Sequence, residues 1–259
     1  MSNYWQDRMA KAQNKLSDKN LKQIQKQLKK YYGKAAERVI RDFESTYDKL
    51  LVTVGEGKQP TPADLYKLNK YWEAQNQLRG QLNKLGERTI STLTKQFEIN
   101  FFDIYYSINI DGHEAFNTID SKIVNQLINQ IWVADGKSFS QRVWDDVDKL
   151  VDTLNDELLH CVITGKKTTE LVKLLQERFG VSYNNADMIA RTEIAHIQTE
   201  AAKKRYEDYG IKQVQIWASP DERRCDVCGK LHKTKYFANE QVPIPAHPRC
   251  RCCIIPVVE

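Results

Sequence analysis

The chain has 259 residues, and 41% of them are hydrophobic, so it is long enough to bury one large core or two smaller ones. It contains no run that approaches the ~18 apolar residues of a membrane-spanning helix, and no apolar signal segment at its N-terminus. These features exclude an integral membrane protein, and we expect a soluble chain made in a reducing compartment, with no membrane partner.

The formal net charge of +5 is unevenly distributed along the chain. Counting Lys and Arg against Asp and Glu gives +7 for residues 1–34, −6 for residues 35–201 and +4 for residues 202–259. Two basic ends around an acidic centre predict contact with an acidic partner surface or nucleic acid. The alternative is that the lysines of the first helix form only a solvated face. We expect that the rest of the chain would fold without residues 1–34.

Apolar residues recur at helical spacing through most of the first 210 residues. We therefore predict a mainly α fold, an elongated helical body of long helices, followed by a small β-rich C-terminal zinc-bound module (α+β overall). The first apolar pattern restarts near Ser17-Asp18, and the next ends at Gly55-Glu-Gly57. Thr61-Pro62-Ala63-Asp64 predicts a helix start, because it supplies a capping residue, a proline at the first helical position and an acid in the first turn.

Glycines mark the ends of the helices that follow. The predicted breaks are Asp111-Gly112, Asp135-Gly136, Thr164-Gly165, Phe179-Gly180 and Tyr209-Gly210, with Ser182 capping the helix after Gly180. Beyond Gly210, Val214-Gln-Ile216-Trp217 alternates like a strand, and four later prolines disfavour a helix. We predict a helical region with a basic first helix at 1–112, a helical core at 113–212 and a zinc-binding module at 213–259.

Five of the six cysteines fall in the last 35 residues. Cys225-x-x-Cys228, followed after eighteen residues by His247-x-x-Cys250, has the spacing of a tetrahedral structural zinc site. We predict a structural zinc ion bound by Cys225, Cys228 and His247, with Cys250 or Cys252 as the fourth ligand. Positions 250 and 252 point the same way in an extended segment, whereas Cys253 would point away. Cys161, alone in a helical pattern, is interpreted as a buried free thiol.

Other interpretations of these residues are weaker. A cluster of disulfides is disfavoured because adjacent cysteines pair poorly. A metal-dependent nuclease would use His232 or His247 as the general base and Asp221 or Glu222 to hold a hard cation. A hydrolytic metal site needs an open coordination position. This cluster offers more soft ligands than the four positions of a tetrahedral zinc ion require, so we expect a closed site. We therefore expect no catalytic or cofactor-binding residues.

Several separate motifs follow one another between residues 132 and 252. They are Trp132, Asp135-Gly136, Phe139-Ser140, Gly165, Ala190-Arg191-Thr192-Glu193, Ala201, Tyr206, Gly210, Trp217, Asp221, Arg224-Cys225-Asp-Val-Cys228 and Pro245-x-His247-Pro248-x-Cys250-Arg251-Cys252. In this order they resemble the phage head morphogenesis proteins, the Mu F-like minor head proteins of tailed bacteriophages. Leu231-His232-Lys233 departs from the Leu-Asp-Gly that such proteins usually carry there. Arg191 and Glu193 are interpreted as structural anchors, since residues two apart on a helix do not face one another.

The resemblance implies a low-copy structural protein of the phage head, not an enzyme, that acts in procapsid assembly at or near the portal. The implied partners are the portal and other head proteins, with DNA contact through the basic ends as a further expectation and no small-molecule substrate. The implied location is the virion head, and the host cytoplasm during assembly. Residues 1–129 match the family only in being helical.

Overall fold

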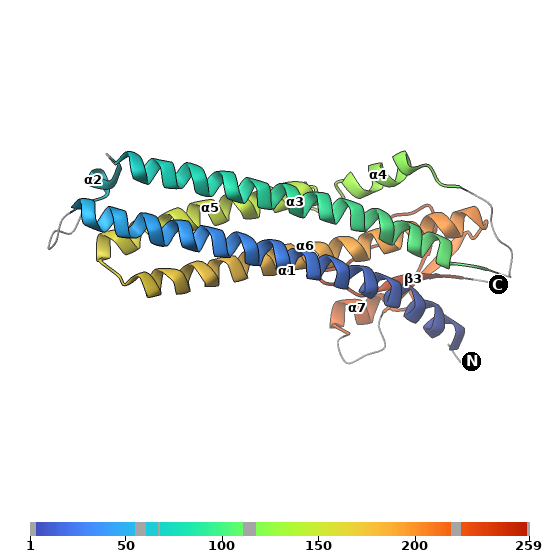
Figure 1. Cartoon of the computed structure of the whole chain (residues 1–259). Coiled ribbons are helices and arrows are strands. Elements are labelled where there is room, and N and C mark those ends of the chain that lie inside the picture. The colour runs from blue at the N-terminus through green and yellow to red at the C-terminus, as the bar shows by residue number, and fades with distance from the viewer. Residues whose placement is uncertain (1–3, 55–60, 67, 111–117, 219–223, 258–259) are drawn as a thin grey trace. The chain divides into compact units, whose positions relative to one another are not determined.

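The computed structural model in Figure 1 describes residues 4–54, 61–66, 68–110, 118–218 and 224–257. It is 75% helical, and its only sheet among these residues has three antiparallel strands. The predicted fold class, mainly α with long helices and a small β-containing C-terminal part, is therefore confirmed. None of the described helices is long and apolar enough to cross a membrane.

Long helices make up most of the chain. They are α1 (Tyr4–Val54), α3 (Asn69–Ser107), α5 (Phe139–Thr164) and α6 (Thr168–Asp208), with shorter helices α2 (Pro62–Tyr66), α4 (Ser121–Asn129) and α7 (Asp226–Leu231). The strands are β1 (Gln213–Trp217), β2 (Lys235–Phe237) and β3 (Cys253–Pro256), and β1 lies between the other two. Val214 pairs with Tyr236 on one side and with Pro256 on the other.

The chain divides into two compact units, each built from segments distant in sequence. Unit 1 comprises Met1–Gln25, Thr92–Phe139 and Met188–Glu259, and unit 2 comprises Lys26–Ser91 and Ser140–Asp187. The long helices α1, α3 and α6 contribute to both units. The proposed regional boundaries at residues 112 and 212 stay a prediction.

Unit 2 is a helical core whose buried residues keep the predicted helical spacing. Tyr47 of α1 is fully buried there, and its hydroxyl donates to the carbonyl oxygens of Cys161 and Lys166. Cys161 is a buried free thiol, as predicted, and burial raises its pKa. The buried apolar residues of this unit include Val39, Phe43, Leu50, Leu78, Leu82, Leu85, Val143, Val147, Leu154, Leu158, Leu171 and Leu175.

In unit 1 the start of α1 packs directly on the sheet. Ala10 is buried against Trp217, Cys253 and Ile255, and Trp217 Nε1 donates to Asp7 Oδ1 at 2.9 Å. The first helix is thus part of the core around β1 and β3. This packing does not support our expectation that the rest of the chain would fold without residues 1–34, because their removal would expose that core to water.

Two predicted helix breaks are wrong. α1 continues through Ser17-Asp18, where the apolar stripe is interrupted by buried polar residues; Asn20 Nδ2, for example, donates to Asn100 Oδ1 at 3.2 Å and to Asp103 Oδ2 at 2.9 Å. α6 likewise continues through Gly180, and the Ser182 hydroxyl donates to Asp146 instead of capping a helix. The predicted breaks at Gly55-Glu-Gly57 and Asp111-Gly112 lie outside the described residues.

The other predicted boundaries agree with the structure. Gly136, Gly165 and Gly210 all have positive φ, a conformation that glycine adopts without steric cost. Thr61 caps α2, because its Oγ1 accepts from the Asp64 backbone N–H at 3.4 Å and its own backbone N–H donates to Asp64 Oδ2 at 3.1 Å.

Two glycines of α3 offer a test of the packing in unit 2. A Cβ on Gly86 would lie 2.8 Å from Trp144 Cζ3, whereas a Cβ on Gly80 would meet nothing within 4 Å. We expect Gly86→Ala to lower the free energy of unfolding by about 1–3 kcal/mol through overpacking. Gly80→Ala should raise it by about 0.5–1 kcal/mol through helix propensity. Urea denaturation of both variants checks this, and equal midpoints would contradict the close approach of Trp144.

Candidate metal centre and basic groove

The first pair of candidate ligands lies at the start of α7. Cys225 is the N-cap residue, and its Sγ accepts a hydrogen bond from the Cys228 backbone N–H at 3.4 Å. The backbone N–H of Gly229 donates to the Cys225 carbonyl at 2.8 Å. This first helical turn places both sulfurs on the same side of the chain, as the C-x-x-C spacing predicts.

The second set of candidate ligands follows a tight turn. The Cys250 backbone N–H donates to the His247 carbonyl at 3.1 Å, and Arg249 between them has a φ of 64°. A non-glycine residue with positive φ is uncommon and needs support from its surroundings. The Arg249 backbone N–H provides part of that support, because it donates to Thr192 Oγ1 of α6 at 3.1 Å. The turn is therefore tied to α6 within unit 1.

The two sets of ligands converge. His247 Nε2 lies 3.3 Å from Cys225 Sγ and 3.1 Å from Cys228 Sγ, and Cys228 Sγ lies 3.7 Å from Cys250 Sγ. Cys225, Cys228 and His247 form one group that could hold a metal ion, and Cys228, Cys250 and Cys252 form a second group that shares Cys228. In a tetrahedral site with metal–sulfur bonds of ~2.3 Å, the ligand atoms lie ~3.5–3.8 Å apart. The observed spacings are close to these values, so each of the two groups could hold a metal ion.

The imidazole of His247 is oriented for metal binding. Its Nδ1 lies 2.9 Å from the Pro248 carbonyl oxygen, which can only accept, so Nδ1 carries the proton. Nε2 faces the sulfurs, and in the neutral ring it is the unprotonated nitrogen with a free lone pair. A backbone carbonyl of this kind is a common partner of metal-binding histidines because it fixes both the tautomer and the ring orientation.

Crowding makes the thiols differ strongly in acidity. The pKa of Cys250 is lowered to about 5, mainly because its sulfur accepts a hydrogen bond from the Cys252 thiol. The pKa of Cys252 is raised, mainly because its thiol donates this hydrogen bond. The pKa of Cys228 is raised to about 12, mainly by burial. Cys225 has a lowered pKa, chiefly because its sulfur accepts from the Cys228 backbone. Negative charge on one thiolate of the buried group makes ionisation of the neighbouring thiols less favourable, unless a cation compensates it.

The remaining cysteines lie outside the cluster. Cys253 is fully buried in the core of unit 1, and its thiol donates to the Trp217 carbonyl at 3.8 Å. All six cysteines are free thiols in the structure, which favours a metal site over the alternative of a disulfide cluster. Among the residues that the structure describes, groups of three or more ligands suited to a metal occur only between Cys225 and Cys252.

The nuclease alternative gains little from the structure. His232 Nδ1 accepts from the Ala218 backbone N–H at 3.2 Å, and its ring packs edge-on against Trp217. His247 Nε2 faces the sulfurs of Cys225 and Cys228. Asp221 and Glu222, the expected ligands of a hard cation, lie outside the described residues.

Arg191-Thr192-Glu193 lies where α6 meets two other segments of unit 1. Glu193 is buried, and its Oε2 accepts from Trp132 Nε1 at 2.9 Å. Trp132 in turn stacks on His196, with 4.2 Å between the ring centroids. Burial lowers the pKa of His196 to about 3, so this ring is neutral at physiological pH. Glu193 thus has the anchoring role that the sequence predicted, and that role stays a prediction for Arg191. Thr192, which accepts from Arg249, and His196, which stacks on Trp132, are contacts that the sequence analysis did not single out.

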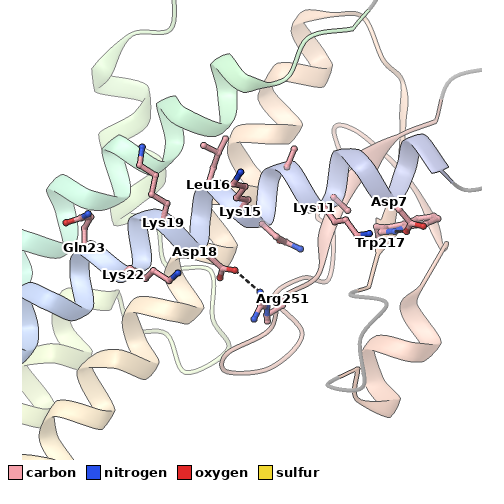
Figure 2. Close-up of a pocket in the computed structure, with 13 residues that line it drawn as sticks. Asp7, Lys11, Lys15, Leu16, Asp18, Lys19, Lys22, Gln23, Trp217 and Arg251 are labelled. Atoms are coloured by element: carbon pink, nitrogen blue, oxygen red, sulfur yellow. Dashed lines mark hydrogen bonds and ion pairs between the residues drawn. The ribbon is translucent and has the colours of Figure 1, made fainter.

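A basic groove runs along the N-terminal part of α1 (Figure 2). It has a volume of about 890 Å³, and Trp217 and Arg251 line it from the C-terminal part of the chain. Its two acids are engaged, since Asp7 accepts from Trp217 and Asp18 pairs with Arg251 at 2.8 Å. Four exposed lysines of one helix also line it, and none has a carboxylate partner among the described residues: Lys11, Lys15, Lys19 and Lys22.

Comparison with known proteins agrees with the resemblance seen in the motifs. Residues 152–255, which include the candidate ligands, match the family model described as "Phage Mu protein F like protein". This match confirms the predicted family resemblance over that part of the chain, while the motifs at Trp132, Asp135-Gly136 and Phe139-Ser140 lie before it. No solved structure matches the chain.

A curated relative covers more of the chain but is a longer protein. The NAD(+)–arginine ADP-ribosyltransferase EFV of Enterococcus faecalis is 26% identical to this chain over 194 residues. The matched part is 67% of this chain and 39% of the relative, so the chain spans well under half of that protein.

Proposed function

We propose that this chain is a minor head protein of a tailed bacteriophage, with a structural role in procapsid assembly at or near the portal. The observation that carries this proposal is the match of residues 152–255 to the Mu F-like family, over the segment that contains the converging ligands. Its partners are the portal protein and other head proteins, and its location is the virion head, reached from the host cytoplasm during assembly.

The metal in this proposal is a structural zinc ion. Thiolates and an imidazole at these spacings suit zinc better than the hard cations, which prefer oxygen ligands. Cys225, Cys228 and His247 would bind it, with Cys250 or Cys252 as the fourth ligand. The bound ion would cross-link α7 to the turn at His247–Cys250. A closed set of four protein ligands leaves no position for a substrate, which supports a structural role and not an enzymatic one.

The zinc assignment predicts a defined metal content. Purified protein should carry about one equivalent of zinc, as expected for a single four-ligand site. Cys225→Ser should lose the metal, and the segment after Lys212 should become sensitive to protease, since metal binding of this kind contributes ~10 kcal/mol or more to folding. Metal analysis and limited proteolysis measure the two effects.

The chain offers matched controls for this experiment. Cys161→Ser changes a thiol of unit 2 and should leave the zinc content unaltered. Comparison of Cys250→Ser with Cys252→Ser should identify the fourth ligand, because only the true ligand is needed for full occupancy. Full zinc occupancy in Cys225→Ser would overturn the assignment.

The head role predicts where the protein is found. In infected cells it should co-purify with procapsids and not with free tails, at a copy number far below that of the major shell protein. Quantitative mass spectrometry of separated particles measures both quantities. Recovery with tails alone, or absence from all particles, would contradict the proposal.

The basic groove on α1 is proposed to contact the packaged DNA. Four lysines without carboxylate partners can each neutralise a phosphate and release a counterion. In the double variant Lys15→Gln/Lys19→Gln, the logarithm of the binding constant for duplex DNA should depend less steeply on the logarithm of the salt concentration. The slope should decrease in magnitude by ~1.8, or ~0.9 per lysine. Lys70→Gln with Lys173→Gln removes the same charge elsewhere and serves as the control. Equal slopes for the two double variants would show that the groove lysines are only solvated.

A further inference from the structure

A second basic site lies in unit 2, between α1 and α3. Two cations from each helix face a common groove of about 130 Å³: Lys34 and Arg38 from α1, and Lys84 and Arg88 from α3. We call these four residues the cation groove. The same groove is lined by Tyr31, Ala35, Gln81 and Leu85, so no acidic residue contributes to it.

The cation groove lacks the charge compensation seen elsewhere on α3. Arg79, less than two helical turns before Lys84, pairs with Asp148 of α5 at 3.1 Å and lies 3.9 Å from Asp152. Within the part of the chain that the structure describes, none of the four groove cations has a carboxylate at ion-pair distance. Like charges on neighbouring helix positions and on facing helices destabilise the free protein, and a bound anion would reverse that cost.

The groove also has an apolar floor. Ala35 is half-buried, and Leu85 is buried beneath the four charges. A phosphodiester backbone gains nothing from such a floor. A peptide can contact both the cations and the apolar floor, because its acidic side chains reach the cations while its apolar or small side chains cover the floor.

We propose that the cation groove binds an acidic helical segment of another protein. On each helix the two cations are four residues apart, or ~6 Å along the axis, which is also the separation of carboxylates at i and i+4 on a partner helix. Facing helices lie ~8–10 Å apart, so a partner helix that lies over the groove has cations on both sides. Charge-assisted hydrogen bonds then replace the repulsion within the groove. This site is separate from the metal centre and from the α1 lysines that line the basic groove of unit 1.

The experiment measures binding of a labelled helical peptide to the full chain by fluorescence anisotropy. The peptide consists of Glu and Ala with Glu at every fourth position, and the same peptide with Gln for Glu is the uncharged control. We expect binding of the Glu peptide only, with an affinity that falls as salt is raised. Lys34→Gln with Lys84→Gln should weaken it by about tenfold or more, because two charge-assisted contacts are lost.

Two further variants separate this proposal from its alternatives. Lys167→Gln with Lys173→Gln removes the same charge from exposed positions of unit 2 outside the groove and should bind like the parent chain. Ala35→Gln blocks the floor without changing the charge, and should weaken peptide binding while leaving duplex DNA binding unchanged. Circular dichroism checks that all variants are folded.

Either of two results would overturn the proposal. The first is equal peptide affinity of the Lys34/Lys84 and Lys167/Lys173 double variants. The second is tight binding of duplex DNA that depends on Lys34 and Lys84 while the Glu peptide fails to bind, which would assign the groove to nucleic acid. Neither readout depends on zinc or on location in the phage head, so failure here is distinguishable from failure of the proposed function.

Discussion

The convergence of several thiols and one imidazole is the constraint on which the C-terminal part of the chain depends. Cys228 Sγ lies 3.1 Å from His247 Nε2 and 3.7 Å from Cys250 Sγ, so two ionised thiols at the second distance would repel each other unless a cation lay between them. The strands on either side are three to five residues long, too short to hold α7 and the His247 turn by themselves. A metal ion would turn this repulsion into the strongest link in the segment.

Packing of the two chain ends on each other imposes a second requirement. Gln13 Nε2 of α1 donates to the Tyr206 hydroxyl at 3.0 Å and to the Ile254 carbonyl at 3.3 Å. Tyr206 is fully buried, and burial raises its pKa. One amide thus joins three segments that are far apart in sequence, and the part of the chain that carries the candidate metal ligands packs on α1. It shares its core with the first residues of the chain.

The sequence predictions that agree with the structure rest on local sequence patterns. The spacing of Cys225, Cys228 and His247 brings ligands together through turns of a few residues, and glycines such as Gly165 end helices through their own backbone freedom. The failed predictions depended on tertiary contacts. Asn20 is acceptable on the buried face of α1 only because Asn100 and Asp103 accept its hydrogen bonds, which no local pattern reveals.

Counting charge by segment misses the cation groove for the same reason. Residues 35–201 are net acidic, yet Arg38 and two cations of α3 meet there because the folded chain places helix faces together, not segments.

The family motifs acquire a physical meaning once their contacts are known. Trp132 and Glu193 are 61 residues apart and share a hydrogen bond, and Thr192 accepts from the backbone of Arg249, 57 residues further on. Adjacent residues of α6 therefore anchor two different segments, one before the helix and one in the turn from His247 to Cys250. In this chain, a change in either partner would leave a buried or strained group unsupported. Both contacts belong to unit 1, and both are made from α6.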